Sequence, residues 1–186
     1  MITKGALQEG QLALVENKFK DAIDAFSKAI DAGEDKFMAH LSRGVAHLRL
    51  KHVDEAISDF SKAAGINSSN PRPFYYKGLA EMIKEDYKSA IGDFSKALDF
   101  NDRLHPARFS RAICYARTDL VDEAMDDFKV VIPLMEENLQ AFTDSYGFVK
   151  TEMWRVMQQA TGEAETVSVP FTEEDLATLK KWLEEG

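Results

Sequence analysis

The sequence predicts an all-α protein built as a solenoid of stacked helix pairs. One segment recurs four times at a spacing of 34 residues without insertion: FKDAIDAFSKAI at 19–30, VDEAISDFSKAA at 53–64, YKSAIGDFSKAL at 87–98 and VDEAMDDFKVVI at 121–132. In each copy the apolar positions lie three, four and seven residues apart, which places them on one face of a helix. A single helix pair cannot bury such faces alone, whereas stacked pairs share a continuous core.

Columns of small residues indicate where two helices approach closely. The four copies of the repeat align an alanine, then a phenylalanine four residues later, and a small residue twelve before the alanine. These columns are Ala22, Ala56, Ala90 and Ala124; Phe26, Phe60, Phe94 and Phe128; and Gly10, Gly44, Gly78 and Ala112. The pattern predicts helix pairs at roughly 3–16 with 19–32, 37–50 with 53–65, 71–84 with 87–99, and 105–118 with 121–135.

These columns resemble the tetratricopeptide repeat family, whose 34-residue unit has small residues at positions 8, 20 and 27 and Phe at position 24. The resemblance covers residues 3–136, with units at 3–36, 37–70, 71–104 and 105–138. It implies a right-handed α-solenoid of four helix pairs. The chain departs from the family at position 4, where the usual aromatic residue is replaced by Ala6, His40 and Arg108. The family's proline at position 32 is also absent, and Pro71 and Pro106 open the following helices instead.

The region after the fourth unit continues the helical pattern and then breaks it. Apolar residues at helical spacing in 137–160 predict a capping helix, as terminal repeats need a polar outer face. Residues 161–171 have no periodicity and are predicted as a linker. Residues 172–185 predict a second amphipathic helix with Thr172 as N-cap. Because an isolated helix of this length is marginal in water, we expect it to dock on its own chain or a neighbouring chain, or to order only on a partner.

The bulk composition restricts the class of partner. The net charge is −9, which disfavours nucleic acid because phosphate binding requires a basic surface. No apolar run approaches the roughly 20 residues that span a bilayer, so membrane insertion is not expected. One cysteine, Cys114, precludes an intrachain disulfide and agrees with a reducing, cytoplasmic location. The start of the chain has no signal-peptide pattern.

Charged residues at fixed positions predict ion pairs inside three of the helix pairs. In these three pairs, the basic residue at position 7 of the repeat, in the first helix, has an aspartate sixteen residues later, in the second helix. The expected pairs are Arg43–Asp59, Lys77–Asp93 and Arg111–Asp127. We interpret them as fixing helix packing rather than capturing a ligand.

The sequence predicts no enzyme, no cofactor and no metal centre. It has no glycine-rich phosphate loop and no GxSxG motif, and no Cys/His spacing matches a zinc site. His40 and His47 occupy positions where the family packs aromatic side chains, so we expect them in the core rather than as ligands. Cys114 stands between Ile113 and Tyr115 and is expected to be a small buried apolar residue.

The resemblance implies a function as a non-enzymatic adaptor or scaffold for another protein. Family members hold ligands on a concave face formed by the first helix of each pair. Transferred to this chain, those positions predict a largely apolar groove, suited to an apolar or helical peptide segment, with arginines at its rim. The predicted groove residues are Leu41, Val45, Leu48, Arg49, Arg72, Tyr75, Tyr76, Leu79, Met82, Phe109, Ile113 and Arg117.

Other interpretations of these residues are weighed against the adaptor with an apolar groove. The family's carboxylate clamp for acidic chaperone tails is not expected, because its positions carry the wrong side chains. Aligned from the first unit they are Leu7, Gln11, Ser42, Arg72 and Tyr76, and aligned from the second they are Leu41, Val45, Tyr76, Pro106 and Ser110. A self-assembling structural protein, in which residues 172–185 dock on a neighbouring chain, remains the alternative. The groove residues could also serve only to pack adjacent first helices together.

Overall fold

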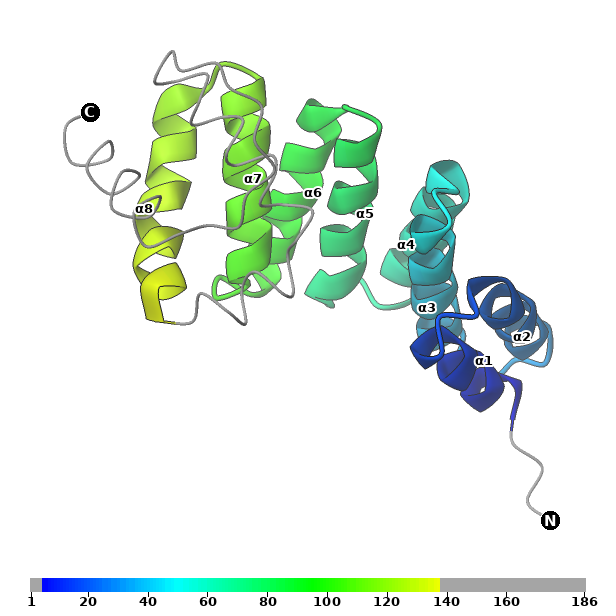
Figure 1. Cartoon of the computed structure of the whole chain (residues 1–186). Coiled ribbons are helices and arrows are strands. Elements are labelled where there is room, and N and C mark those ends of the chain that lie inside the picture. The colour runs from blue at the N-terminus through cyan, green and yellow to red at the C-terminus, as the bar shows by residue number, and fades with distance from the viewer. Residues whose placement is uncertain (1–4, 138–186) are drawn as a thin grey trace. The chain divides into compact units, whose positions relative to one another are not determined.

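The computed structural model describes residues 5–137 (Figure 1). The chain divides into two compact units, residues 1–102 and 103–186. The described residues form eight α-helices and no strand. Residues 138–160 of the predicted capping helix, the predicted linker at 161–171 and the predicted helix at 172–185 lie outside the described residues.

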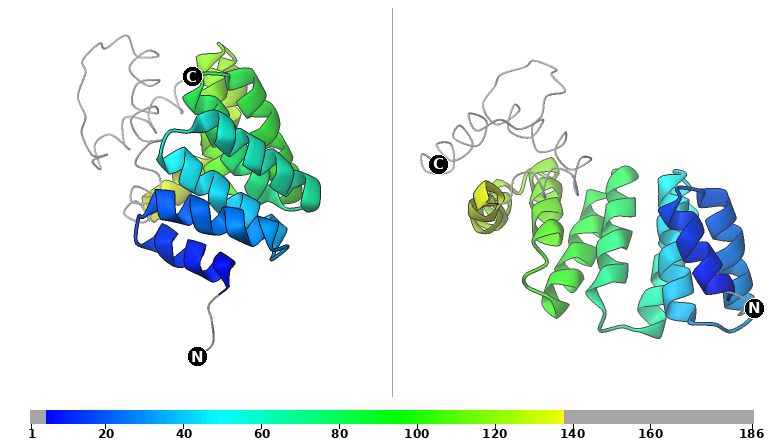
Figure 2. Two further views of the ribbon diagram at one scale, coloured as in Figure 1. Left: turned by 90° about the vertical axis from the view of Figure 1, so that its right-hand side faces the viewer. Right: turned by 60° about the horizontal axis from the view of Figure 1, so that its bottom comes forward.

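The first unit contains three helix pairs. They are α1 (Ala6–Val15) with α2 (Phe19–Asp31), α3 (Lys36–Arg49) with α4 (Val53–Ile66), and α5 (Pro71–Ile83) with α6 (Tyr87–Phe100). Each first helix packs on its own second helix, and α2 and α4 each pack on the first helix of the next pair. The first helices also contact one another, α1 with α3 and α3 with α5. The views in Figure 2 show these neighbouring pairs from two further sides.

The second unit contains the fourth pair, α7 (His105–Arg117) and α8 (Val121–Glu137), which pack against each other. All eight helices lie within a few residues of the ranges that the repeat columns predict. Pro71 stands at the first position of α5, and Pro106 stands in the first turn of α7. A proline at these positions has no hydrogen bond to lose, because the first N–H groups of a helix have no partner within it.

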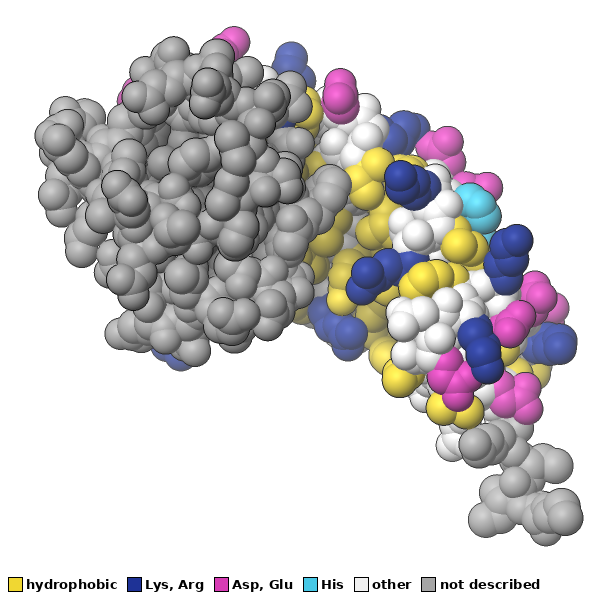
Figure 3. Space-filling model, viewed as in Figure 1, with side chains coloured by type: hydrophobic (Ala, Val, Ile, Leu, Met, Phe, Trp, Pro, Cys, Tyr) yellow, Lys and Arg dark blue, Asp and Glu magenta, His cyan; other side chains and the backbone are white. Residues whose placement is uncertain are grey.

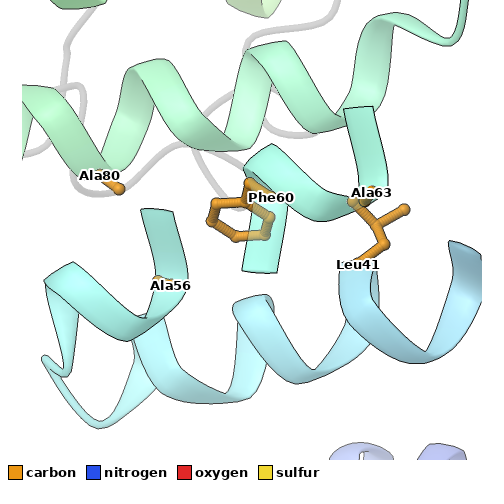
Figure 4. Packing of buried hydrophobic residues seen from close by; sticks show 5 residues of the cluster. All are labelled: Leu41, Ala56, Phe60, Ala63 and Ala80. Carbon is orange, nitrogen blue, oxygen red and sulfur yellow. The ribbon is translucent and has the colours of Figure 1, made fainter. Parts of the chain in front are cut away.

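Each pair has a buried phenylalanine in its core, and in the first three pairs its ring lies against a glycine of the preceding helix. Phe26, Phe60, Phe94 and Phe128 are all buried. Figure 4 shows Phe60 of α4 with Leu41 of α3 and Ala80 of α5, which belong to one buried cluster. A Cβ built on Gly44 would lie 2.6 Å from the Phe60 ring. Gly10 and Gly78 meet Phe26 and Phe94 in the same way, at 2.6 and 2.7 Å.

The turn within each pair repeats one backbone conformation. A non-glycine residue with positive φ follows each first helix, at 58° to 63°: Asn17, Lys51, Glu85 and Asp119. These residues are 34 apart, so the left-handed position is part of the repeat. The left-handed residue reverses the chain after the first helix, where many proteins use glycine.

The Phe60–Gly44 contact predicts that a single methyl group is not tolerated. Gly44→Ala should lower the free energy of unfolding by about 1–3 kcal/mol, because the added carbon forces the ring or the helix to move. Gly92→Ala is the matched control. It is also a helical glycine, a Cβ added there would have no neighbouring atom within 4 Å, and alanine should stabilise the helix by about 0.5–1 kcal/mol. Chemical denaturation of both variants measures this, and equal effects would contradict the packing argument.

Candidate functional site

Each of the three predicted ion pairs is present, and each aspartate is buried. Asp59 is 2% exposed and accepts two hydrogen bonds from Arg43, Nε to Oδ2 and Nη2 to Oδ1, both at 2.8 Å. Burial opposes the charge of Asp59, but the hydrogen bonds from Arg43 and His40 outweigh it and lower the pKa of the carboxyl. Arg43 also donates from Nη1 to the Ser27 hydroxyl of the preceding pair at 2.9 Å. This guanidinium therefore joins three helices.

The residue at position 4 adds a second partner to the buried aspartate. His40, 8% exposed, places Nδ1 2.9 Å from Oδ1 of Asp59. In the second unit, Arg108 donates to Asp127 at 3.1 Å while Arg111 binds the same carboxylate through Nε at 2.7 Å. The expectation that His40 lies in the core is confirmed, and its role there is polar.

The third pair has a different arrangement, with two carboxyl groups around one ammonium. Lys77 Nζ lies 2.7 Å from Asp93 and 3.3 Å from Glu81. Glu81 is 7% exposed, and its Oε2 has no hydrogen-bond partner. Burial and the neighbouring Asp93 carboxylate raise the pKa of Glu81 to about 7. The sequence did not single out this residue, because a glutamate in a helix is ordinarily solvated.

The twelve predicted groove residues differ widely in exposure. Nine lie on α3 and α5 in the first unit and three on α7 in the second. Arg49 and Arg72 are exposed. The half-buried members are Val45, Leu48, Tyr75, Tyr76, Leu79 and Arg117, and the buried members are Leu41, Met82, Phe109 and Ile113. Buried side chains pack the helices together, so the accessible part of the prediction is narrower than the full set.

We define the α3–α5 face as the accessible members on those two adjacent helices: Val45, Leu48, Arg49, Arg72, Tyr75, Tyr76 and Leu79. Val45, Leu48 and Tyr76 pack with one edge on the buried cluster around Phe60. Further exposed apolar residues stand on the same series of first helices: Leu12 and Val15 on α1 and Ile83 on α5, at 46%, 80% and 41% exposure. Figure 3 shows hydrophobic side chains interleaved with Lys and Arg on the described part of the face in view.

The described residues include no group of three or more His, Cys, Asp or Glu that could hold a metal ion. Cys114 is buried, as expected. His47 corrects the sequence prediction, because it is half-buried and faces His52 instead of lying in the core. No helix in the described part of the chain is long and apolar enough to cross a membrane.

Comparisons with known proteins agree with this architecture. A tetratricopeptide repeat family model matches residues 7–71, and no curated protein matches the chain. MamA from Desulfovibrio magneticus RS-1 is 21% identical, with 72% of this chain and 75% of that chain covered and a TM-score of 0.66. YrrB, described as a TPR protein with an unusual peptide-binding site, is 21% identical, with 95% and 90% covered and a TM-score of 0.65. The Arabidopsis OM64 TPR domain is 23% identical, with 59% and 90% covered and a TM-score of 0.57.

At these identities the solved structures establish the fold, and the family match identifies residues 7–71 as tetratricopeptide repeats. The all-α solenoid predicted from the repeat columns is confirmed.

The buried carboxylate of Asp59 predicts a large difference between two aspartates of the same helix. Asp59→Ala should lower the free energy of unfolding by about 3–5 kcal/mol, because it leaves Arg43 and His40 without their buried partner. Asp54→Ala removes an exposed pair with Lys84 and should cost at most about 1 kcal/mol. Urea denaturation of the two variants checks this, and comparable losses would show that burial does not set the energy.

The raised pKa of Glu81 predicts that the free energy of unfolding decreases as pH rises. The ordinary pKa of a glutamate is 4.5, and that of Glu81 in the folded protein is about 7. Between these two pH values the folded state binds more protons than the unfolded state, so raising the pH favours unfolding. Glu81→Gln has an uncharged side chain and should be more stable than the wild type above pH 7. The difference should approach roughly 3.5 kcal/mol, because the pKa rises from 4.5 to about 7 and each pKa unit corresponds to about 1.4 kcal/mol. Thermal melts across this range measure it, with Glu85→Gln, an exposed carboxyl nearby, as control. Parallel profiles for wild type and Glu81→Gln would refute it.

Proposed function

We propose that the protein is a non-enzymatic adaptor that binds an apolar, helical segment of another protein on its α3–α5 face. The observation that carries this proposal is the composition of the face. Half-buried Val45, Leu48 and Leu79 present apolar surface beside the exposed guanidinium groups of Arg49 and Arg72. Accessible apolar patches often mark binding sites in soluble proteins, and an amphipathic helix is a segment that fits an apolar helical groove.

The charges of the face specify the partner further. Arg49 and Arg72 are the exposed charges of the α3–α5 face, and neither makes an ion pair with Asp59 or Asp93, which Arg43 and Lys77 occupy. The second helices of the first unit carry exposed acidic residues instead, such as Asp54 and Glu55 on α4. A partner helix with acidic residues beside its apolar stripe would pair with the arginines, whereas a basic one would be repelled. Arginine is suited to such bidentate carboxylate contacts.

The likeness to YrrB supports a peptide-binding role at the level of the fold. YrrB is described as having a peptide-binding site, and the same scaffold places first helices side by side in the first unit of this chain. A shared fold does not fix a ligand, so the choice of the α3–α5 face rests on this chain's own residues.

The experiment is affinity capture from the source organism's lysate with three baits: the wild type, the double variant Arg49→Glu/Arg72→Glu, and the control Lys62→Glu. All three substitutions are at exposed positions, so the fold should survive, and circular dichroism verifies this. We expect a partner that wild type and Lys62→Glu retain and that the double variant loses. The captured segment is then synthesised, and its affinity for the double variant should fall at least about tenfold, or 1.4 kcal/mol.

Equal capture by all three baits would contradict the proposed face. Recovery of the bait's own sequence alone, with a sedimentation coefficient that rises with concentration, would favour the self-assembling structural protein instead.

A further inference from the structure

Two imidazoles face each other at the turn that joins α3 to α4. Nδ1 of His47 lies 3.4 Å from Nδ1 of His52, and the ring centroids are 5.7 Å apart at an interplanar angle of 45°. His47 stands in the last turn of α3 and His52 is the N-cap of α4. His47 is half-buried and His52 is exposed. The adaptor function assigned to the α3–α5 face does not use either ring.

The backbone holds this pair in place through the same turn that recurs in every repeat. The N–H of His52 donates to the carbonyl oxygen of His47 at 2.9 Å, and Lys51 between them adopts φ of 63°. The equivalent bonds in the other turns measure 2.8, 3.0 and 2.9 Å: Lys18 to Ala13, Asp86 to Glu81 and Leu120 to Tyr115. The turn thus brings together two side chains five residues apart, and in the second repeat both are histidines.

The separation of the nitrogens matches two ligands of one metal ion. Imidazole nitrogens bind Zn²⁺ at about 2.0–2.1 Å, so two of them in tetrahedral coordination lie about 3.3–3.4 Å apart. A hydrogen bond between ring nitrogens would ordinarily be shorter, near 2.9–3.0 Å. To bind one ion, both rings would direct their Nδ1 lone pairs toward it.

The surroundings of His47 favour the neutral form of its ring. Burial lowers the pKa of His47, and Arg43 and His52 act in the same direction, while Asp59 and Glu55 oppose them. A neutral imidazole is the form that binds metal. The positive charge of Arg43 is balanced by Asp59, and the exposed carboxylate of Glu55 lies one turn beyond His52 on α4. The local field therefore does not exclude a cation.

We propose that His47 and His52 form a surface site for a divalent transition-metal ion of the Zn²⁺ class, bridging the turn between α3 and α4. The pair supplies two ligands, and water completes the coordination. The ion would link the last turn of α3 to the start of α4, so metal binding would stabilise the second repeat. Imidazole suits Zn²⁺, Cu²⁺ and Ni²⁺ and does not suit Mg²⁺ or Ca²⁺.

The test is calorimetric titration of Zn²⁺ into the full chain at a pH about one unit above the ordinary histidine pKa of about 6.5. We expect saturable binding that His47→Ala and His52→Ala each weaken at least about tenfold, the effect seen even for residues that only support metal ligands. His105→Gln, which removes one imidazole elsewhere, is the control and should bind as the wild type does. The side chain of His52 makes no capping hydrogen bond, so its loss should not unfold α4.

A second measurement separates the site from adventitious binding. Zn²⁺ should raise the melting temperature of the wild type and of His105→Gln, and it should leave His52→Ala unchanged, because ligands stabilise the state they bind. One Zn²⁺ per two chains, still lost with either histidine, would support the site with a second copy completing the coordination. Absence of saturable binding, or binding that survives either single substitution, would overturn it.

Discussion

The contact between a phenylalanine ring and a glycine backbone is the constraint on which the rest of this structure depends. In each of the first three pairs the ring fills the space that a side chain on the glycine would need. This close approach sets the distance between the two helices, and the distance determines which residues of one helix can reach the other. In the second and third pairs, where the backbones are this near, ion pairs join residues sixteen apart in sequence across the two helices.

Apolar packing and ion pairs make different contributions to these helix pairs. Alanine and phenylalanine columns supply apolar burial that is nearly identical from repeat to repeat. The buried aspartates fix the relative orientation of the two helices, because a carboxylate that accepts hydrogen bonds from two donors tolerates little rotation or sliding. The partners around the aspartate vary, with His40 beside Arg43, Glu81 beside Lys77, and Arg108 beside Arg111. The polar surroundings of the buried aspartate therefore differ between repeats whose apolar columns are similar.

Much of this could be predicted from sequence, because the repeat compares the chain with itself. Four aligned copies located the helices, and the co-occurrence of a cation with an aspartate located the ion pairs. The raised pKa of Glu81 and the meeting of His47 with His52 were not predictable in this way, since each occurs in one repeat only and depends on three-dimensional proximity. The groove prediction was limited for a related reason. Position in the repeat identifies the helix face, whereas the exposure of Leu41 or Leu48 depends on how far the next helix covers it.

The hydrogen bond from Arg43 to Ser27 has a consequence for how the molecule opens. The first repeat has Glu9 and Ala25 where later repeats have a cation and an aspartate, so it lacks the buried pair that joins the two helices of the second repeat. Instead, the Glu34 carboxylate accepts hydrogen bonds from the N–H groups of Ala6 and Leu7 at the start of α1. The Arg43 guanidinium adds a hydrogen bond from the second repeat to Ser27 on α2. Because neighbouring layers of a repeat array can open separately, the amides of the first repeat would exchange with solvent before those of the second.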